Sequence, residues 1–148
     1  MTQNKLSVLP TQCDCERCSI MCQGPCCGTP QDVLKLIESG YAHRLMLDDW
    51  PDASFIPIAI KPALKGHEGE KAPWDVQSYE GCTFWIDGKC ELHNLDLKPI
   101  QGRLAHHDNT KEQDEVIGQL IKDAWNTEEA QEVIKKWKKE VEYDDSSD

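Results

Sequence analysis

Six of the eight cysteines in this 148-residue chain lie within fifteen residues, at positions 13 to 27. A lone buried cysteine behaves as a small hydrophobic side chain, but apolar packing gives no reason to gather six thiols beside glutamine, glycine and proline. Eight cysteines in a secreted chain would indicate disulfides, whereas in the reducing cytosol the same count indicates metal or redox chemistry. Residues 1 to 10 contain one lysine and no apolar stretch typical of a secretory signal, so we expect a cytoplasmic protein.

The spacing inside this segment suits thiolate ligands that converge on one point. Cys18 and Cys22 are four residues apart, so one helical turn would place them on the same face. Cys26 has the same spacing from Cys22, but Gly24-Pro25 breaks any helix between them, which predicts a tight loop. Cys26 and Cys27 are adjacent and their side chains diverge, so both need not bind the same ion. The alternatives are that one of them lies beside the ligands, or that the pair bridges two metals.

The other two cysteines flank a predicted β-hairpin. Asp87-Gly88 lies between aromatic and β-branched residues, which is the strongest short-range signal for a hairpin turn. If Cys82 and Cys90 are both ligands they must share a face, which requires a three-residue loop that ends on a left-handed glycine. A two-residue loop would instead place Cys82 opposite His93 as a Cys/His pair and leave Cys90 on the other face.

Five further candidate ligands are weaker: Cys13, Cys15, His93, His106 and His107. The two cysteines flank the cluster in a flexible arm, and the sequence leaves their role open. His93 stands three residues after Cys90, a spacing that metal sites use. The adjacent pair of histidines points apart, so at most one reaches a given ion. An exposed or hydrogen-bonded structural role is the expected one for each histidine.

These features resemble the YkgJ-type cysteine-cluster family, which is described as a zinc- or iron-chelating domain. The resemblance covers about residues 13 to 107 and rests on the double cysteine combined with the Cys-x7-Cys hairpin. The matching segments are the spaced cysteines of 18–27, the helix start at 29–33, the hairpin at 82–90 and the turn at 98–103. The expected metal ligands are Cys18, Cys22, Cys26, Cys27, Cys82 and Cys90.

The chain departs from the family pattern after the hairpin. Where the family has Arg-Pro-x-x-Cys-Arg, this chain has Lys98-Pro99-Ile100-Gln101-Gly102-Arg103, so Gly102 stands in place of a cysteine. A neighbouring histidine or an additional N-terminal cysteine would then have to complete the ligand set.

Local signals predict a small α+β fold that is mainly helical and carries one β-hairpin. Thr29, Pro30 and Asp32 predict a capped helix start, and the helix runs to Gly40. Residues 41–50 are predicted to add a helical turn or two. Apolar residues recur at helical spacing through 111–141, which predicts a helical hairpin whose second helix is capped by Asn126.

We expect one domain spanning residues 13–141, preceded by a flexible arm at 1–12 and followed by a disordered acidic tail at 142–148. Within it, residues 13–110 form the metal-binding core and residues 111–141 the helical hairpin. The net charge of −11 disfavours binding to nucleic acid or to an anionic membrane, so a metal ion is the expected partner. No protein partner is indicated.

The leading interpretation is a cytoplasmic protein that binds zinc or an iron–sulfur cluster, with the metal chiefly structural. Four thiolates suit either zinc or iron, and mixed Cys/His ligation would favour zinc. Two alternatives stay open: a metal-dependent redox or group-transfer enzyme, and a metal carrier. The sequence contains no phosphate-binding loop and no dinucleotide fingerprint, so it assigns no reaction.

Overall fold

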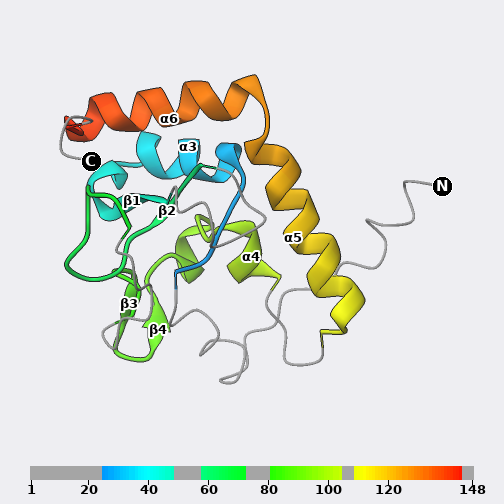
Figure 1. Ribbon diagram of the computed structural model, residues 1–148. Helices are drawn as coiled ribbons and strands as arrows, with labels where there is room; N and C mark the ends of the chain where they lie inside the picture. The colour runs from blue at the N-terminus through cyan, green and yellow to red at the C-terminus, as the bar shows by residue number, and fades with distance from the viewer. Residues whose placement is uncertain (1–24, 49–57, 73–80, 105–108, 145–148) are drawn as a thin grey trace.

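The computed structural model describes residues 25–48, 58–72, 81–104 and 109–144 (Figure 1). Its helices are α3 (Pro30–Glu38), α4 (Ile100–Arg103), α5 (Lys111–Trp125) and α6 (Glu128–Val141), with short 3-10 helices η1 (Ala42–Arg44) and η2 (His93–Leu95). Its strands are β1 (Leu45–Asp48), β2 (Ala59–Pro62), β3 (Trp85–Ile86) and β4 (Lys89–Cys90), paired as two antiparallel two-stranded sheets. The predicted α+β class is confirmed, whereas most of the predicted cysteine-rich loop lies outside the described residues.

Helix α3 begins where the cysteine segment ends. Thr29 Oγ1 accepts a hydrogen bond from the Asp32 N–H at 3.2 Å, and the Thr29 N–H donates to Asp32 Oδ2 at 3.1 Å. This capping box satisfies two N–H groups, and Pro30 at the first helical position has no N–H to satisfy. The predicted helix start is confirmed. The helix ends at Glu38, shortly before Gly40, whose φ of +92° suits glycine.

The prediction for residues 41–50 is wrong over most of its described part. Only η1 is helical there, and the next four residues form β1, which pairs with β2 in the register Leu45↔Pro62 to Asp48↔Ala59. Leu45, Met46 and Leu47 are all buried, so strand β1 is covered on both faces. A short continuous apolar run of this kind carries no alternation to distinguish a strand from a helix.

The segment after β2 connects the two sheets. Leu64 forms an isolated antiparallel bridge with Cys82, and the Thr83 N–H donates to the Ala63 carbonyl at 2.8 Å. Lys65 donates in turn to the carbonyl of Gly81 at 2.9 Å. The hairpin of β3 and β4 is therefore fixed to the end of β2 by backbone hydrogen bonds.

Arg44 fixes the same hairpin from the side. Its guanidinium donates to both carboxylate oxygens of Glu91, at 2.9 and 3.0 Å, and to the Thr83 carbonyl at 2.8 Å. It also lies over the Phe84 ring, 4.3 Å from the ring centroid. The planar guanidinium makes two parallel hydrogen bonds to one carboxylate and stacks on an aromatic ring. A lysine ammonium can do neither, so this position favours arginine.

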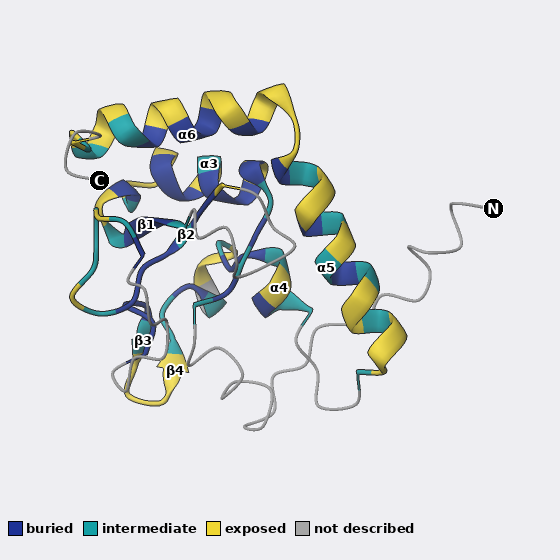
Figure 2. Cartoon of the chain, in the orientation of Figure 1, coloured by how far each residue is buried: buried dark blue, intermediate teal, exposed yellow. Residues whose placement is uncertain are grey.

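Helices α5 and α6 form as predicted, but they do not lie alongside each other as a hairpin: α6 packs over α3, and α5 runs away from it below their connection (Figure 1). Figure 2 shows α6 buried on the face toward α3 and exposed on the opposite face. Trp125 and Trp137 are almost fully buried, as expected of core anchors. The predicted cap is wrong by one residue, because Asn126 ends α5 and the Thr127 hydroxyl accepts the Ala130 N–H that opens α6. Among the described helices, none is long and apolar enough to cross a membrane.

Both tryptophans also make a buried hydrogen bond with a distant segment. Trp125 Nε1 donates to the Gly28 carbonyl at 2.6 Å, and Trp137 Nε1 donates to the Ala42 carbonyl at 2.9 Å. Phenylalanine keeps most of the ring but leaves the carbonyl without its donor. We therefore expect Trp125→Phe and Trp137→Phe each to lower the free energy of unfolding by about 1–3 kcal/mol, measured by urea denaturation. A loss well below this range in both variants would contradict the importance of these hydrogen bonds.

Candidate metal centre

Cys26 and Cys27 are the two members of the cysteine cluster that the structure describes. Cys26 is buried and Cys27 is half-buried, and both are present as thiols rather than as a disulfide. The backbone of Cys27 is held on both sides by Gln101: its N–H donates to Gln101 Oε1 at 2.7 Å, and its carbonyl accepts the Gln101 N–H at 3.0 Å. The end of the cluster is therefore fixed against helix α4.

The residue that replaces the expected family cysteine lies directly against Cys26. A Cβ placed on Gly102 would be 2.9 Å from Cys26 Sγ and 3.2 Å from Lys98 Cγ. The sulfur therefore fills the space in which a side chain at position 102 would begin. This is a close-packing reason for glycine at this position, and it shows that position 102 adjoins the thiol of Cys26.

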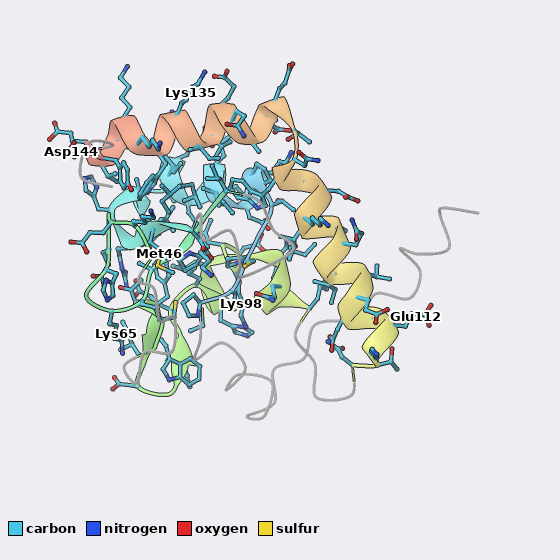
Figure 3. The ribbon with its side chains drawn as sticks, viewed as in Figure 1. Met46, Lys65, Lys98, Glu112, Lys135 and Asp144 are labelled. Atoms are coloured by element: carbon cyan, nitrogen blue, oxygen red, sulfur yellow. The ribbon has the colours of Figure 1, made fainter. Side chains whose placement is uncertain are left out.

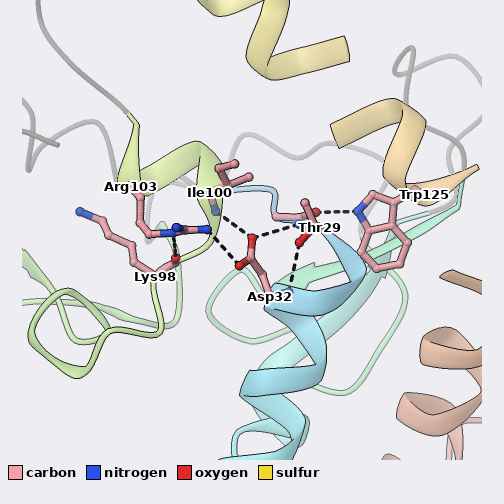
Figure 4. Close-up of polar contacts among 7 residues, drawn as sticks. Thr29, Asp32, Lys98, Ile100, Arg103 and Trp125 are labelled. Carbon is pink, nitrogen blue, oxygen red and sulfur yellow. Dashed lines mark hydrogen bonds and ion pairs between the residues drawn. The ribbon is translucent and has the colours of Figure 1, made fainter. Parts of the chain in front are cut away.

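Asp32 joins the cysteine segment, α3 and the 98–103 turn (Figure 4). Besides capping α3, its Oδ2 accepts the Ile100 N–H at 3.0 Å, and its Oδ1 accepts a hydrogen bond from Arg103 at 3.1 Å. Arg103 Nε donates to the Lys98 carbonyl at 2.9 Å, so the same guanidinium closes the turn. The carboxylate is only 9% exposed, and charge-assisted hydrogen bonds offset the cost of its burial.

Gly28 lets these parts approach one another. A Cβ at Gly28 would lie 2.8 Å from both Asp32 Oδ2 and Pro99 Cβ, a distance that requires something to shift. Its carbonyl accepts the indole hydrogen bond of Trp125, which Figure 4 also shows. The two residues that follow Cys26 are therefore packed between α3, α5 and the 98–103 turn.

A lysine–aspartate pair lies near both thiols. Lys61 Nζ is 2.8 Å from Asp48 Oδ2. Burial raises the pKa of the Cys27 thiol, Lys61 opposes this shift, and Asp48 adds to it. Burial acts to lower the pKa of Lys61, but Cys27, Asp48 and Cys26 together raise it above its usual value. The surroundings therefore keep Lys61 charged beside a Cys27 thiol that is protonated at neutral pH in the absence of metal.

The hairpin has the two-residue turn, not the three-residue loop predicted for the case in which Cys82 and Cys90 are both ligands. Trp85 pairs with Cys90 and Ile86 with Lys89, which leaves a two-residue turn of Asp87 and Gly88 with φ of 52° and 80°. A turn with positive φ at both positions matches the right-handed twist of the strands. Asp followed by Gly is a favoured residue pair for such a turn.

The alternative placement of Cys82 opposite His93 does not occur either. Cys82 precedes β3 in a turn closed by the Trp85 N–H and the Cys82 carbonyl, at 2.9 Å. His93 belongs to η2 rather than to a strand. The buried Cys82 Sγ accepts the Phe84 N–H at 3.5 Å, while Cys90 is half-buried at the end of β4. The prediction that loop length decides which faces Cys82 and His93 share fails, because the β3–β4 ladder has only two residue pairs and neither residue belongs to it.

His93 already has a partner for one ring nitrogen. Lys98 Nζ lies 3.2 Å from His93 Nδ1, and an ammonium can only donate, so the neutral ring accepts at Nδ1. In this arrangement Nδ1 is not a metal ligand. The structure thus supports the expected hydrogen-bonded role of this histidine.

The six expected ligands are only partly placed. Cys18 and Cys22 lie outside the described residues, as do Cys13, Cys15, His106 and His107. Within the described ranges, no three or more His, Cys, Asp or Glu residues are grouped so that they could hold a metal ion. The described part of the chain therefore provides two neighbouring thiols, Cys26 and Cys27, to which further ligands would have to be added.

No family model, no curated protein and no solved structure matches this chain. The function therefore has to be argued from the residues and their geometry.

Sequence patterns did not reveal the residues that surround the two thiols. Lys61 and Lys98 look like ordinary surface lysines in the sequence, and Asp32 looks like a helix cap alone. The one available signal was Gly102, because its place in the family pattern already marked the 98–103 turn as part of the site.

The contact between Gly102 and Cys26 can be tested by a double-mutant cycle. Gly102→Ala is expected to lower the free energy of unfolding of the metal-free protein by about 1–3 kcal/mol, because overpacking costs this much. In a Cys26→Ala background most of this loss should disappear, since the opposing sulfur is gone. Equal effects of Gly102→Ala in both backgrounds, measured by urea denaturation, would show that the two positions are not coupled.

Proposed function

We propose that this chain is a metal-binding protein that holds zinc or an iron–sulfur cluster through thiolates of the cysteine cluster, and that the metal is chiefly structural. The observation that carries the proposal is the packing of Cys26 Sγ against Gly102. The YkgJ-type pattern has a cysteine where this chain has Gly102. The resemblance assigns positions 26 and 102 to one site, and in the structure these two positions are neighbours.

The donor chemistry supports the same proposal. Cys26 and Cys27 offer two soft sulfur ligands, and Lys61 supplies positive charge that favours their ionised, metal-binding form. Cys18 and Cys22 precede them at ligand spacing, and together these four would give a tetrathiolate set suited to zinc or iron. Cys82 and Cys90 stay predictions without support from the described residues, in which neither forms a group of three possible ligands with Cys26 and Cys27.

The surroundings of the thiols favour a retained ion over a transferred one. Cys26 is 8% exposed, and the backbone of Cys27 is held by Gln101 on both sides. A carrier has to release its cargo, which requires accessible or movable ligands. A rigid pair of thiols, one buried and one half-buried, suits a structural centre, whose binding free energy stabilises the fold.

Removing the metal or a ligand should destabilise the protein. We expect a chelator, or Cys26→Ser, to lower the thermal unfolding temperature by more than 10 °C, because metal binding contributes directly to folding. Elemental analysis and the absorption spectrum of anaerobically purified protein identify the metal, since an iron–sulfur cluster absorbs visible light and zinc does not. The chelator should have little further effect on Cys26→Ser, which serves as the internal control. Metal-free wild type that is as stable as the metal-bound protein would overturn the structural role.

Metal affinity should also depend on pH. Burial holds the pKa of Cys27 above its usual value of 9.0, so this thiol carries a proton between pH 6 and 8 and must lose it to bind. Each proton displaced makes binding about tenfold weaker per unit fall in pH. Zinc affinity, measured by competition with a chelator of known pH dependence, is therefore expected to fall at least tenfold per unit. An affinity independent of pH would contradict binding through Cys27.

A further inference from the structure

Lys98 is a buried lysine with an unusual set of neighbours. It is 6% exposed, although lysine is almost never fully buried unless its charge is compensated. Its ammonium donates to His93 Nδ1 at 3.2 Å. Within the described ranges this neutral ring nitrogen is its one polar partner, and no carboxylate pairs with it. Lys61 differs, because Asp48 balances its charge.

The same lysine lies beside the Cys26 thiol. The space that a Cβ at Gly102 would occupy is bounded by Cys26 Sγ at 2.9 Å and by Lys98 Cγ and Cε at 3.2 and 3.3 Å. The sulfur and the lysine stem thus border the same small space, and the ammonium is one bond beyond Cε. A buried positive charge is therefore held close to a candidate thiolate ligand.

Three contacts hold Lys98 in this position. Arg103 Nε donates to its carbonyl, Gly102 leaves room for its stem, and His93 accepts a hydrogen bond from its ammonium. Figure 3 places Lys98 beside α4, in contrast to Lys135, which points outward from α6. A side chain fixed at its backbone, stem and head is positioned before any metal binds.

We propose that Lys98 is a positioning residue for the metal centre, which supplies a fixed positive charge that stabilises the negative charge of the bound thiolates. This inference rests on the proposed metal binding through Cys26. A tetrathiolate zinc centre carries a net charge of −2, so a nearby cation is stabilised by the centre and stabilises it in return. The centre then provides the compensation that the described part of the protein does not give to Lys98.

If the proposal holds, a substitution at Lys98 changes the affinity for metal without lowering the stability of the metal-free fold. Lys98→Met keeps the length of the side chain and removes its charge. We expect it to weaken zinc binding about ten- to hundredfold, the range typical of residues that surround metal ligands. Metal-free Lys98→Met should be at least as stable as metal-free wild type, because it no longer buries a charge with which none of the described carboxylates pairs.

Three controls accompany this measurement. Lys98→Arg keeps the charge and should bind zinc within about threefold of wild type. Lys135→Met makes the same change in net charge on the outer face of α6 and should leave the affinity unchanged. Cobalt-loaded Lys98→Met should keep the thiolate-to-metal and d–d absorption bands of wild type, since no ligand is lost.

The outcomes distinguish this inference from the proposed function. If wild type binds neither zinc nor cobalt through its thiols, the proposed function fails and this inference fails with it. If wild type binds zinc and Lys98→Met binds it equally well, only the role of Lys98 is overturned. A metal-free Lys98→Met that is less stable than metal-free wild type would also overturn it, because the ammonium would then be compensated by the protein itself.

Discussion

The buried carboxylate of Asp32 is the interaction on which the arrangement around the cysteines depends. One oxygen accepts the N–H groups of Thr29 and Ile100, and the other accepts a hydrogen bond from Arg103. Two segments that are distant in the sequence, the start of α3 and the 98–103 turn, are thereby held around one charge. Because a buried carboxylate is costly without such donors, the two segments stabilise the charge as much as the charge fixes them.

The position of Cys26 follows from this arrangement. The 98–103 turn that Asp32 fixes carries Gly102 against the sulfur, Gln101 against the backbone of Cys27, and the stem of Lys98 against the space that lies beside Gly102 and the Cys26 sulfur. If the turn moved, all three contacts would be lost together. The thiols are therefore held by a rigid polar framework, although the proposed site would use soft sulfur ligands.

Local signals in the sequence were sufficient to predict α3, the Asp87-Gly88 turn and the two C-terminal helices, because caps, turn residues and helical spacing act over a few residues. The second role of Asp32 could not be predicted in this way, because its partners Ile100 and Arg103 are 68 and 71 positions away. Strand β1 was missed for a related reason: its apolar run is identified as a strand only by its pairing with β2. The cysteines indicated the donor atoms of the site, but the surrounding lysines are brought near only by the fold.

The hydrogen bond from Trp125 to Gly28 spans 97 positions and has a consequence for synthesis of the chain. The cysteine segment leaves the ribosome long before α5, so its thiols are exposed while the indole that fixes the end of their loop has not yet been made. The end of this segment can reach its folded position only after most of the polypeptide has emerged. During that interval the nascent thiols depend on the reducing power of their surroundings, so oxidative stress would damage the protein mainly while it is being made.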